Sequence, residues 1–109
     1  MISIDDFKKV ELRVGTIIEV NDFPEAKKSA YKLKIDFGGF GLRQSSAKIT
    51  NHYTKDELIN KQVVAVVNFP TKKVANFISE VLVLGAAGQN KGIILLDVDK
   101  PIQNGAKIS

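Results

Sequence analysis

The sequence predicts an all-β protein with short helices, folded as a small closed or partly open antiparallel barrel. Two unbroken apolar runs, residues 63–67 and 81–84, are rich in β-branched side chains, which is typical of strands covered on both faces. Residues 12–20 and 31–37 alternate apolar and polar side chains, as half-buried strands do. Because the helix signals are short and there is no repeat or linker, these strands should build one barrel core.

The first half of the chain should hold two capped helices and three strands. Ser3 with Asp6 and Thr54 with Glu57 form capping patterns, so we expect short helices after Ser3 and over residues 54–59. Gly15 predicts a bulge in the strand of residues 12–20. That strand should place its side chains on two faces: Leu12, Val14, Thr16, Ile18 and Val20 opposite Arg13, Ile17 and Glu19.

The next strand, residues 31–37, should turn its lysines toward water, and the Gly-Gly pair at 38–39 indicates a hairpin into a third strand over residues 40–49. Pro70 cannot donate to a sheet, so residues 68–73 should leave the sheet and expose Lys72 and Lys73. Further along, residues 85–92 predict a flexible turn, residues 93–96 a buried strand, and the Asn-Gly pair at 104–105 a tight turn.

Length and charge limit the possible functions. With 109 residues, we expect residues 1–109 to form a single domain. The net charge is +4, and residues 43–79 carry the whole excess, with six basic against two acidic side chains. A basic region of this kind is typical of polyanion binding, although charge alone is more often explained by solvated lysines that keep a small protein soluble.

The residues offer little for catalysis. There is no cysteine, the single histidine, His52, lies in a loop, and the serines at 45–46 lack the surroundings of a nucleophile elbow. We therefore expect no enzymatic activity, no catalytic residue, no metal and no cofactor. No stretch approaches the roughly 18 consecutive apolar residues of a membrane span, and no secretory signal is evident. We expect a cytoplasmic protein without membrane insertion.

Binding has more support from the residues. The centre of the third strand, residues 43–47, is small and polar and either lines a groove or forms an exposed sheet face. Phe69 and Phe77 flank Lys72 and Lys73, a combination of aromatic and basic side chains that suits unstacked nucleic acid. The same rings are also common core residues.

Several separated segments carry a family resemblance. Residues 6–15, DFKKVELRVG, resemble the opening of the tRNA-binding domain that is appended to some aminoacyl-tRNA synthetases, and residues 23–26 and 53–61 continue the resemblance. Residues 43–50, 68–70 and 79–85 are similar to a bacterial and archaeal branch of this family whose members are protein-secretion chaperones. The resemblance implies a five-stranded OB-fold barrel, a homodimer and no enzymatic activity.

The resemblance also implies a ligand, either an unfolded export-bound polypeptide or, as the alternative, tRNA or another structured RNA. Glu80 would place a carboxylate where phosphate approaches, which favours a polypeptide. The candidate ligand-binding residues are Arg43, Gln44, Ser45, Ser46, Lys48, Asn68, Phe69, Lys72, Lys73, Phe77, Ser79 and Glu80. For the dimer, the candidate apolar side chains are Ile2, Ile4, Phe7, Ile102 and Ile108.

Overall fold

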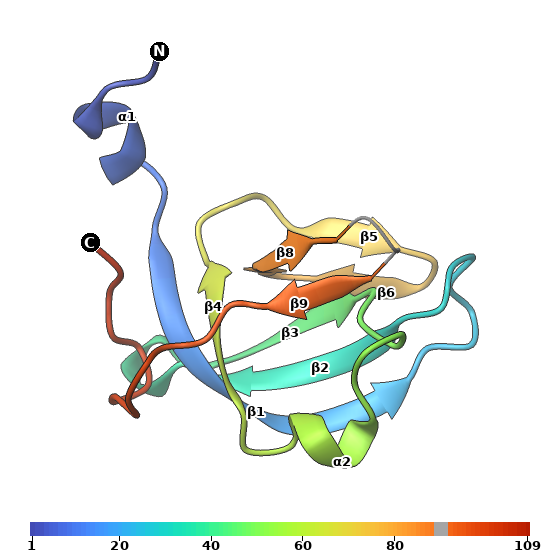
Figure 1. Cartoon of the computed structure of the whole chain (residues 1–109). Helices are drawn as coiled ribbons and strands as arrows, with labels where there is room; N and C mark the ends of the chain where they lie inside the picture. The colour runs from blue at the N-terminus through green and yellow to red at the C-terminus, as the bar shows by residue number, and fades with distance from the viewer. Residues whose placement is uncertain (89–91) are drawn as a thin grey trace.

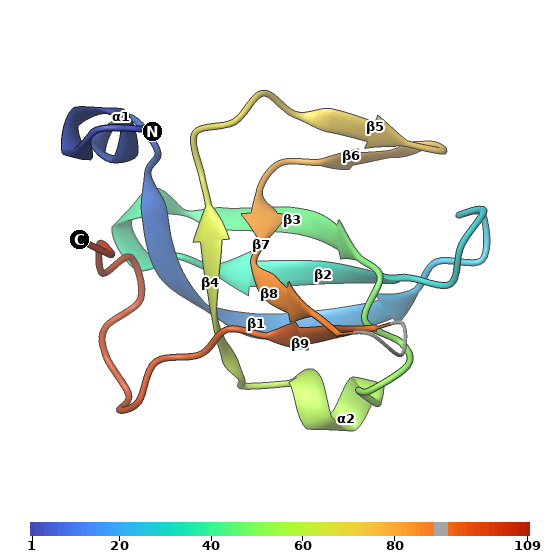
Figure 2. The same cartoon turned by 45° about the horizontal axis from the view of Figure 1, so that its top comes forward.

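The main sheet has five antiparallel strands. The structure, a computed structural model, describes residues 1–88 and 92–109. The strands are β1 (Leu12–Asp22), β2 (Tyr31–Asp36), β3 (Leu42–Ala47), β4 (Gln62–Val66) and β7 (Leu82–Val83). They lie in the order β3-β2-β1-β4-β7 and curve around a common interior (Figures 1 and 2). β1 is the longest and pairs with both β2 and β4, so it belongs to both halves of the barrel.

The bulge in β1 lies three residues beyond the expected glycine. Ile17 pairs with Ile35 and Glu19 pairs with Lys34, which leaves Ile18 as the extra residue. The bulge reverses the alternation of side chains beyond this point, so Val20, which pairs with Leu33, lies on the same face as the fully buried Ile17, and Ile18 itself is 41% exposed. The expectation that Val20 and Ile17 lie on opposite faces is therefore wrong.

The barrel is closed between β3 and the residues that lead into β7. The Glu80 backbone N–H donates to the Gln44 carbonyl over 2.8 Å, and the Ser46 N–H donates to Ser79 Oγ over 3.2 Å. The buried Ser45 hydroxyl donates to the Val81 carbonyl over 3.1 Å. A single backbone bond and several side-chain bonds thus replace a continuous ladder at this junction, so the barrel is nearly closed.

Two small hairpins extend from the barrel. β5 (Lys72–Val74) pairs with β6 (Phe77–Ser79), and β8 (Gly85–Ala87) pairs with β9 (Ile93–Leu95). Figure 2 shows the β5–β6 hairpin beyond β3 and separate from the main sheet. Lys72 and Lys73 are exposed as expected, but they form a strand rather than part of a loop. The expected turn over residues 85–92 is also wrong at its start, where β8 forms, and its residues 89–91 lie outside the described residues.

The later apolar runs are less buried than expected. β4 is buried at four consecutive positions, which confirms its place in the core. By contrast, Leu82 in β7 and Ile94 in β9 are each 48% exposed. Each of these strands is short and has one face outside the barrel, so only Val81 and Leu95 of these two segments belong to the core cluster.

The helices and turns agree with the sequence. α1 (Ile4–Lys8) and α2 (Lys55–Leu58) each begin with a complete capping box, at Ser3 and Thr54. The β2–β3 hairpin turns through the 3-10 helix η1 (Gly38–Phe40). Residues 104–108 turn at Gly105 and run beside β1, where the Ile108 N–H donates to the Leu12 carbonyl. No helix within the described part of the chain is long and apolar enough to cross a membrane.

The core cluster fills the barrel. Its buried members are Ile17, Leu33, Ile35, Phe37, Ile49, Leu58, Val63, Ala65, Val81 and Leu95. Leu58 brings α2 against one end of the barrel, and Leu95 brings in β9. This arrangement, an all-β OB-type barrel with short helices, confirms the fold class expected from the sequence.

Candidate functional site

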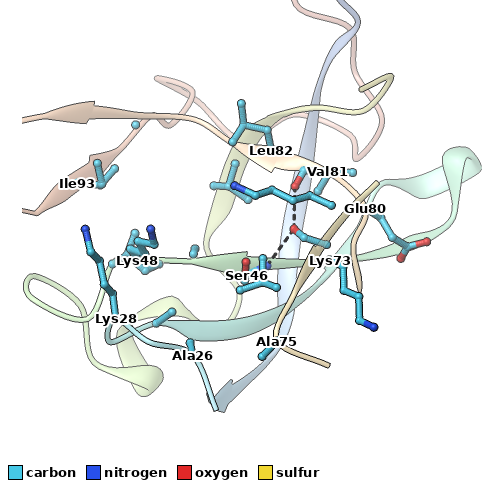
Figure 3. A pocket seen from close by; sticks show the side chains of 18 of the residues that line it. Ala26, Lys28, Ser46, Lys48, Lys73, Ala75, Glu80, Val81, Leu82 and Ile93 are labelled. Carbon is cyan, nitrogen blue, oxygen red and sulfur yellow. Dashed lines mark hydrogen bonds between the residues drawn. The ribbon is translucent and has the colours of Figure 1, made fainter. Parts of the chain in front are cut away.

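A groove of about 940 Å³ opens on one side of the barrel. Its walls are residues 25–28, which follow β1, and the β5–β6 hairpin, while the end of β3 and the segment from Ser79 through β7 to β8 and β9 form its floor. Figure 3 shows Lys28 and Lys48 on one side of the groove and Lys73 on the other, with Ser46 and Val81 between them. The groove is therefore built from segments that are far apart in the sequence.

The floor of the groove is aliphatic. Ala30, Ile49, Val81 and Leu95 are buried members of the lining, and Val83, Leu84 and Ile93 are half-buried. Leu82 lies beside them with 48% of its surface exposed. A concave apolar surface of this kind can take apolar groups of a ligand out of water.

The rim of the groove is basic. Five exposed lysines line it, Lys27, Lys28, Lys48, Lys72 and Lys73, against two acidic residues, Glu25 and Glu80. None of the five forms an ion pair within residues 1–88 and 92–109, whereas Lys9, Lys34, Lys55 and Lys61 each pair with a carboxylate. The groove lysines are therefore available to an anionic or hydrogen-bonding ligand.

The structure brings seven of the twelve candidate residues into this groove: Ser46, Lys48, Phe69, Lys72, Lys73, Ser79 and Glu80. The other five lie outside its lining. Ser45 is buried and 1% exposed, and Gln44 donates to the Ile78 carbonyl. Asn68 joins Glu11 to Lys9, and Arg43 Nε donates to the Phe40 carbonyl. Phe77 packs on Phe23. These five side chains support the barrel and its hairpin instead of forming the groove surface.

Glu80 has a structural partner. Its Oε1 accepts the Gln44 backbone N–H over 3.0 Å, and its own N–H donates to the Gln44 carbonyl over 2.8 Å. The carboxylate therefore takes part in closing the barrel, although Glu80 also lines the groove.

Sequence reasoning missed Lys27, Lys28, Leu82 and Ile93 as groove residues. The adjacent pair Lys27-Lys28 could have indicated a basic surface. It was missed because the total charge of the surrounding part of the chain is balanced. Leu82 and Ile93 looked like ordinary core residues because each belongs to an apolar run.

The groove has no evident means of holding a metal. The described residues contain no group of three or more histidine, cysteine or acidic side chains that could hold an ion. At the two helix caps, hydrogen bonds from Ser3 and Thr54 hold the pKa of Asp6 and of Glu57 below its ordinary value. A hydrogen bond from Lys55 to Asp22, 2.9 Å long, holds the pKa of the Lys55 ammonium above its ordinary value.

Comparison with known proteins shows the family. Residues 12–107 match the family described as "Putative tRNA binding domain", and the chain belongs to this family. Over its full length it is similar to two CsaA chaperone structures. The protein from Picrophilus torridus is 59% identical with a TM-score of 0.94, and each chain is covered completely. The protein from Bacillus anthracis is 48% identical with a TM-score of 0.96, over 100% of this chain and 99% of that one.

The chain also matches a part of larger enzymes, the methionine–tRNA ligases. The methionine–tRNA ligase of Pyrococcus abyssi is 40% identical over 107 residues, which is 98% of this chain and 14% of the ligase. The ligase of Thermococcus onnurineus gives 38% identity with the same shares. The chain thus spans only a small part of these relatives. The family and the CsaA-like branch expected from the sequence are confirmed.

Proposed function

We propose that this chain is a non-enzymatic, cytoplasmic binding protein that holds extended segments of unfolded polypeptides, including export-bound ones, in its groove. The aliphatic floor carries the proposal, because unfolded chains expose apolar side chains that a folded protein would bury. Among residues 1–88 and 92–109, β6 is the one strand that pairs with β5, so the other edge of β5 can accept backbone hydrogen bonds from an extended segment. The similarity to two proteins described as CsaA chaperones supports the same function.

A titration of the purified protein with an unfolded preprotein tests this function. Leu82→Asp puts a charge on the groove floor and should weaken binding, because the ligand's apolar groups would meet a carboxylate. The matched control is Ile94→Asp, since Ile94 has the same exposure of 48% but does not line the groove. Equal affinities of the two variants would contradict polypeptide binding in this groove.

A second candidate function is binding of tRNA or another structured RNA. It is favoured by the five groove lysines, which form no ion pair with another described residue, and by the description of the family. Changing Lys72 or Lys73 to alanine should weaken binding to all RNAs alike and should lower the slope of log affinity against log salt by about 1, since one fewer counterion is released. Lys100→Ala, an exposed position outside the groove, is the control. An unchanged slope in both variants would contradict phosphate binding by β5.

We also propose that two copies of the chain form a homodimer. The support is a group of large apolar side chains near the two ends of the chain: Met1, Ile2 and Ile4 are strongly exposed, and Ile102 is 45% exposed. Both ends lie on the same side of the barrel in both views (Figures 1 and 2). Most soluble oligomers pair such surfaces about a two-fold axis.

A further inference from the structure

The two walls of the groove belong to segments with no strand pairing between them. One wall, residues 25–28, follows β1, and the other is the β5–β6 hairpin. The hairpin is a separate two-stranded sheet, and its bonds to the barrel run from β6 and its following residues to Gln44 and Ser46. No strand pairing therefore fixes the distance between the walls, and side chains that bridge them can contribute to it.

A cluster of three side chains connects the walls. The rings of Phe23 and Phe77 lie 5.5 Å apart between centroids in an edge-to-face arrangement. Lys32 Nζ lies 4.9 Å from the centroid of Phe23 and 5.7 Å from that of Phe77. Phe23 lies two residues before the first wall, and Phe77 directly follows the turn of the hairpin.

We propose that Lys32, acting through the rings of Phe23 and Phe77, is a positioning residue that sets the width of the ligand groove. Lys32 is not part of the groove lining, so it acts without touching the ligand. Its ammonium group attracts the faces of two rings that come from different walls, and this attraction favours one separation of the walls. The proposal rests on the proposed function only in treating the groove as the binding site.

The place of Lys32 in the sheet explains why it can do this. It lies on β2 between Tyr31 and Leu33, and Leu33 is 1% exposed in the core, so Lys32 points to the opposite face of the sheet. β2 pairs with both β1 and β3, which makes it a rigid base for a side chain that must hold two less firmly attached segments.

The absence of cysteine allows a direct test in the ligand-free protein. Lys27→Cys and Asn76→Cys place two exposed thiols, one on each wall, and no other cysteine competes for spin labels. The distance distribution between the labels should broaden when Lys32 is changed to methionine. It should return to its original width with Lys32→Arg, which keeps a cation over the rings.

Lys34→Met is the matched control, because Lys34 lies on the same face of β2 but pairs with Glu19 at 3.9 Å. It should leave the distribution unchanged. Phe77→Leu is a second test, because it removes one of the two rings that Lys32 contacts. This variant should also broaden the distribution of label distances. Circular dichroism of each variant checks that the barrel is intact. A distribution that stays as narrow in Lys32→Met and Phe77→Leu as in Lys34→Met would overturn the proposal.

Binding to a permanently unfolded, carboxymethylated polypeptide supplies the second readout. Lys32→Met should weaken it by about two- to fivefold, the loss expected from one cation–π contact at an exposed site, and Lys32→Arg should restore it. If no variant binds the polypeptide, the proposed function fails, but the label distances still decide whether Lys32 sets the groove width. Equal affinities of the original protein and Lys32→Met would overturn the role of Lys32 in binding.

Discussion

Gly15 lies inside β1 where the strand passes closest to the core. A Cβ at this position would lie 2.6 Å from Ile35 Cγ2 and 2.8 Å from two ring carbons of Phe37. Both neighbours are fully buried, so neither side chain can move away easily. The glycine is thus required by packing, whereas its position in a strand suggested a bulge.

Gly15→Ala should lower the free energy of unfolding by about 1–3 kcal/mol, the usual cost of overpacking a core. The matched control is Gly39→Ala, since a Cβ at Gly39 would have no neighbour within 4 Å. Urea unfolding of both variants measures the difference. A Gly15→Ala protein as stable as Gly39→Ala would mean that β1 can move away from Phe37.

Glu80 allows a second prediction at the residue scale. Glu80→Ala removes the acceptor of the half-buried Gln44 N–H and should lower the free energy of unfolding by about 1–3 kcal/mol. Glu80→Gln keeps an oxygen at this position and should cost less. Glu25→Ala, on the groove wall formed by residues 25–28, is the control for charge alone. Thermal unfolding distinguishes these cases, and a Glu80→Ala protein as stable as Glu25→Ala would contradict a role in barrel closure.

At the scale of elements, α2 is a short helix whose start depends on one capping box. The Thr54 N–H donates to Glu57 Oε1 over 2.9 Å, and the Glu57 N–H donates to Thr54 Oγ1 over 3.3 Å. Two hydrogen bonds to the Glu57 carboxyl hold its pKa below the ordinary value. The bond from the Thr54 backbone N–H has the larger effect, and the bond from the Thr54 hydroxyl has the smaller one. α2 in turn places Leu58 in the core.

This lowered pKa predicts a pH dependence. The contribution of Glu57 to stability is complete above the carboxyl's ordinary pKa and is lost as the pH falls below it, because the unfolded chain then takes up the proton more readily. The difference in Tm between the original protein and Glu57→Gln should therefore be largest at neutral pH and should shrink in acid. Asp56→Asn, in the same turn but outside the capping box, is the control. A constant difference from neutral to acidic pH would contradict the prediction.

At the scale of the whole molecule, α1 is the element least integrated into the barrel. It projects from the barrel in Figure 1 and contributes no buried residue. Asn68 anchors the chain just after it, accepting the Glu11 N–H and donating to the Lys9 carbonyl. Ile2 and Ile4 are 79% and 68% exposed, an arrangement that fits contact with a second copy.

Light scattering at micromolar concentration should therefore give a particle of twice the 12.0 kDa mass of the chain. Replacing both Ile2 and Ile4 with serine should shift the equilibrium toward the single chain, because the apolar contact is lost. Ile94→Ser, at a position 48% exposed on β9, should not. A 12.0 kDa particle for the original protein would overturn the homodimer.

The sequence by itself determined the features that depend on near neighbours in the chain. Both helix caps, the hairpin after β2, the turn at Gly105 and the burial of β4 all follow from local patterns. The separated family segments determined the barrel class. Lys72 and Lys73 were also recognised as exposed, because Pro70 beside them limits regular sheet pairing.

The tertiary structure alone decided which residues form the groove. Lys27 and Lys28 line the same groove as the β5–β6 hairpin, and Phe23 packs on Phe77 across more than fifty residues of sequence. Likewise, the bulge at Ile18 placed Val20 on the same face as Ile17, and the bonds between Gln44 and Glu80 turned a candidate ligand group into part of the barrel. Local patterns record the periodicity of a strand, but they carry no information about which distant strand or side chain will complete its hydrogen bonds and cover its apolar face.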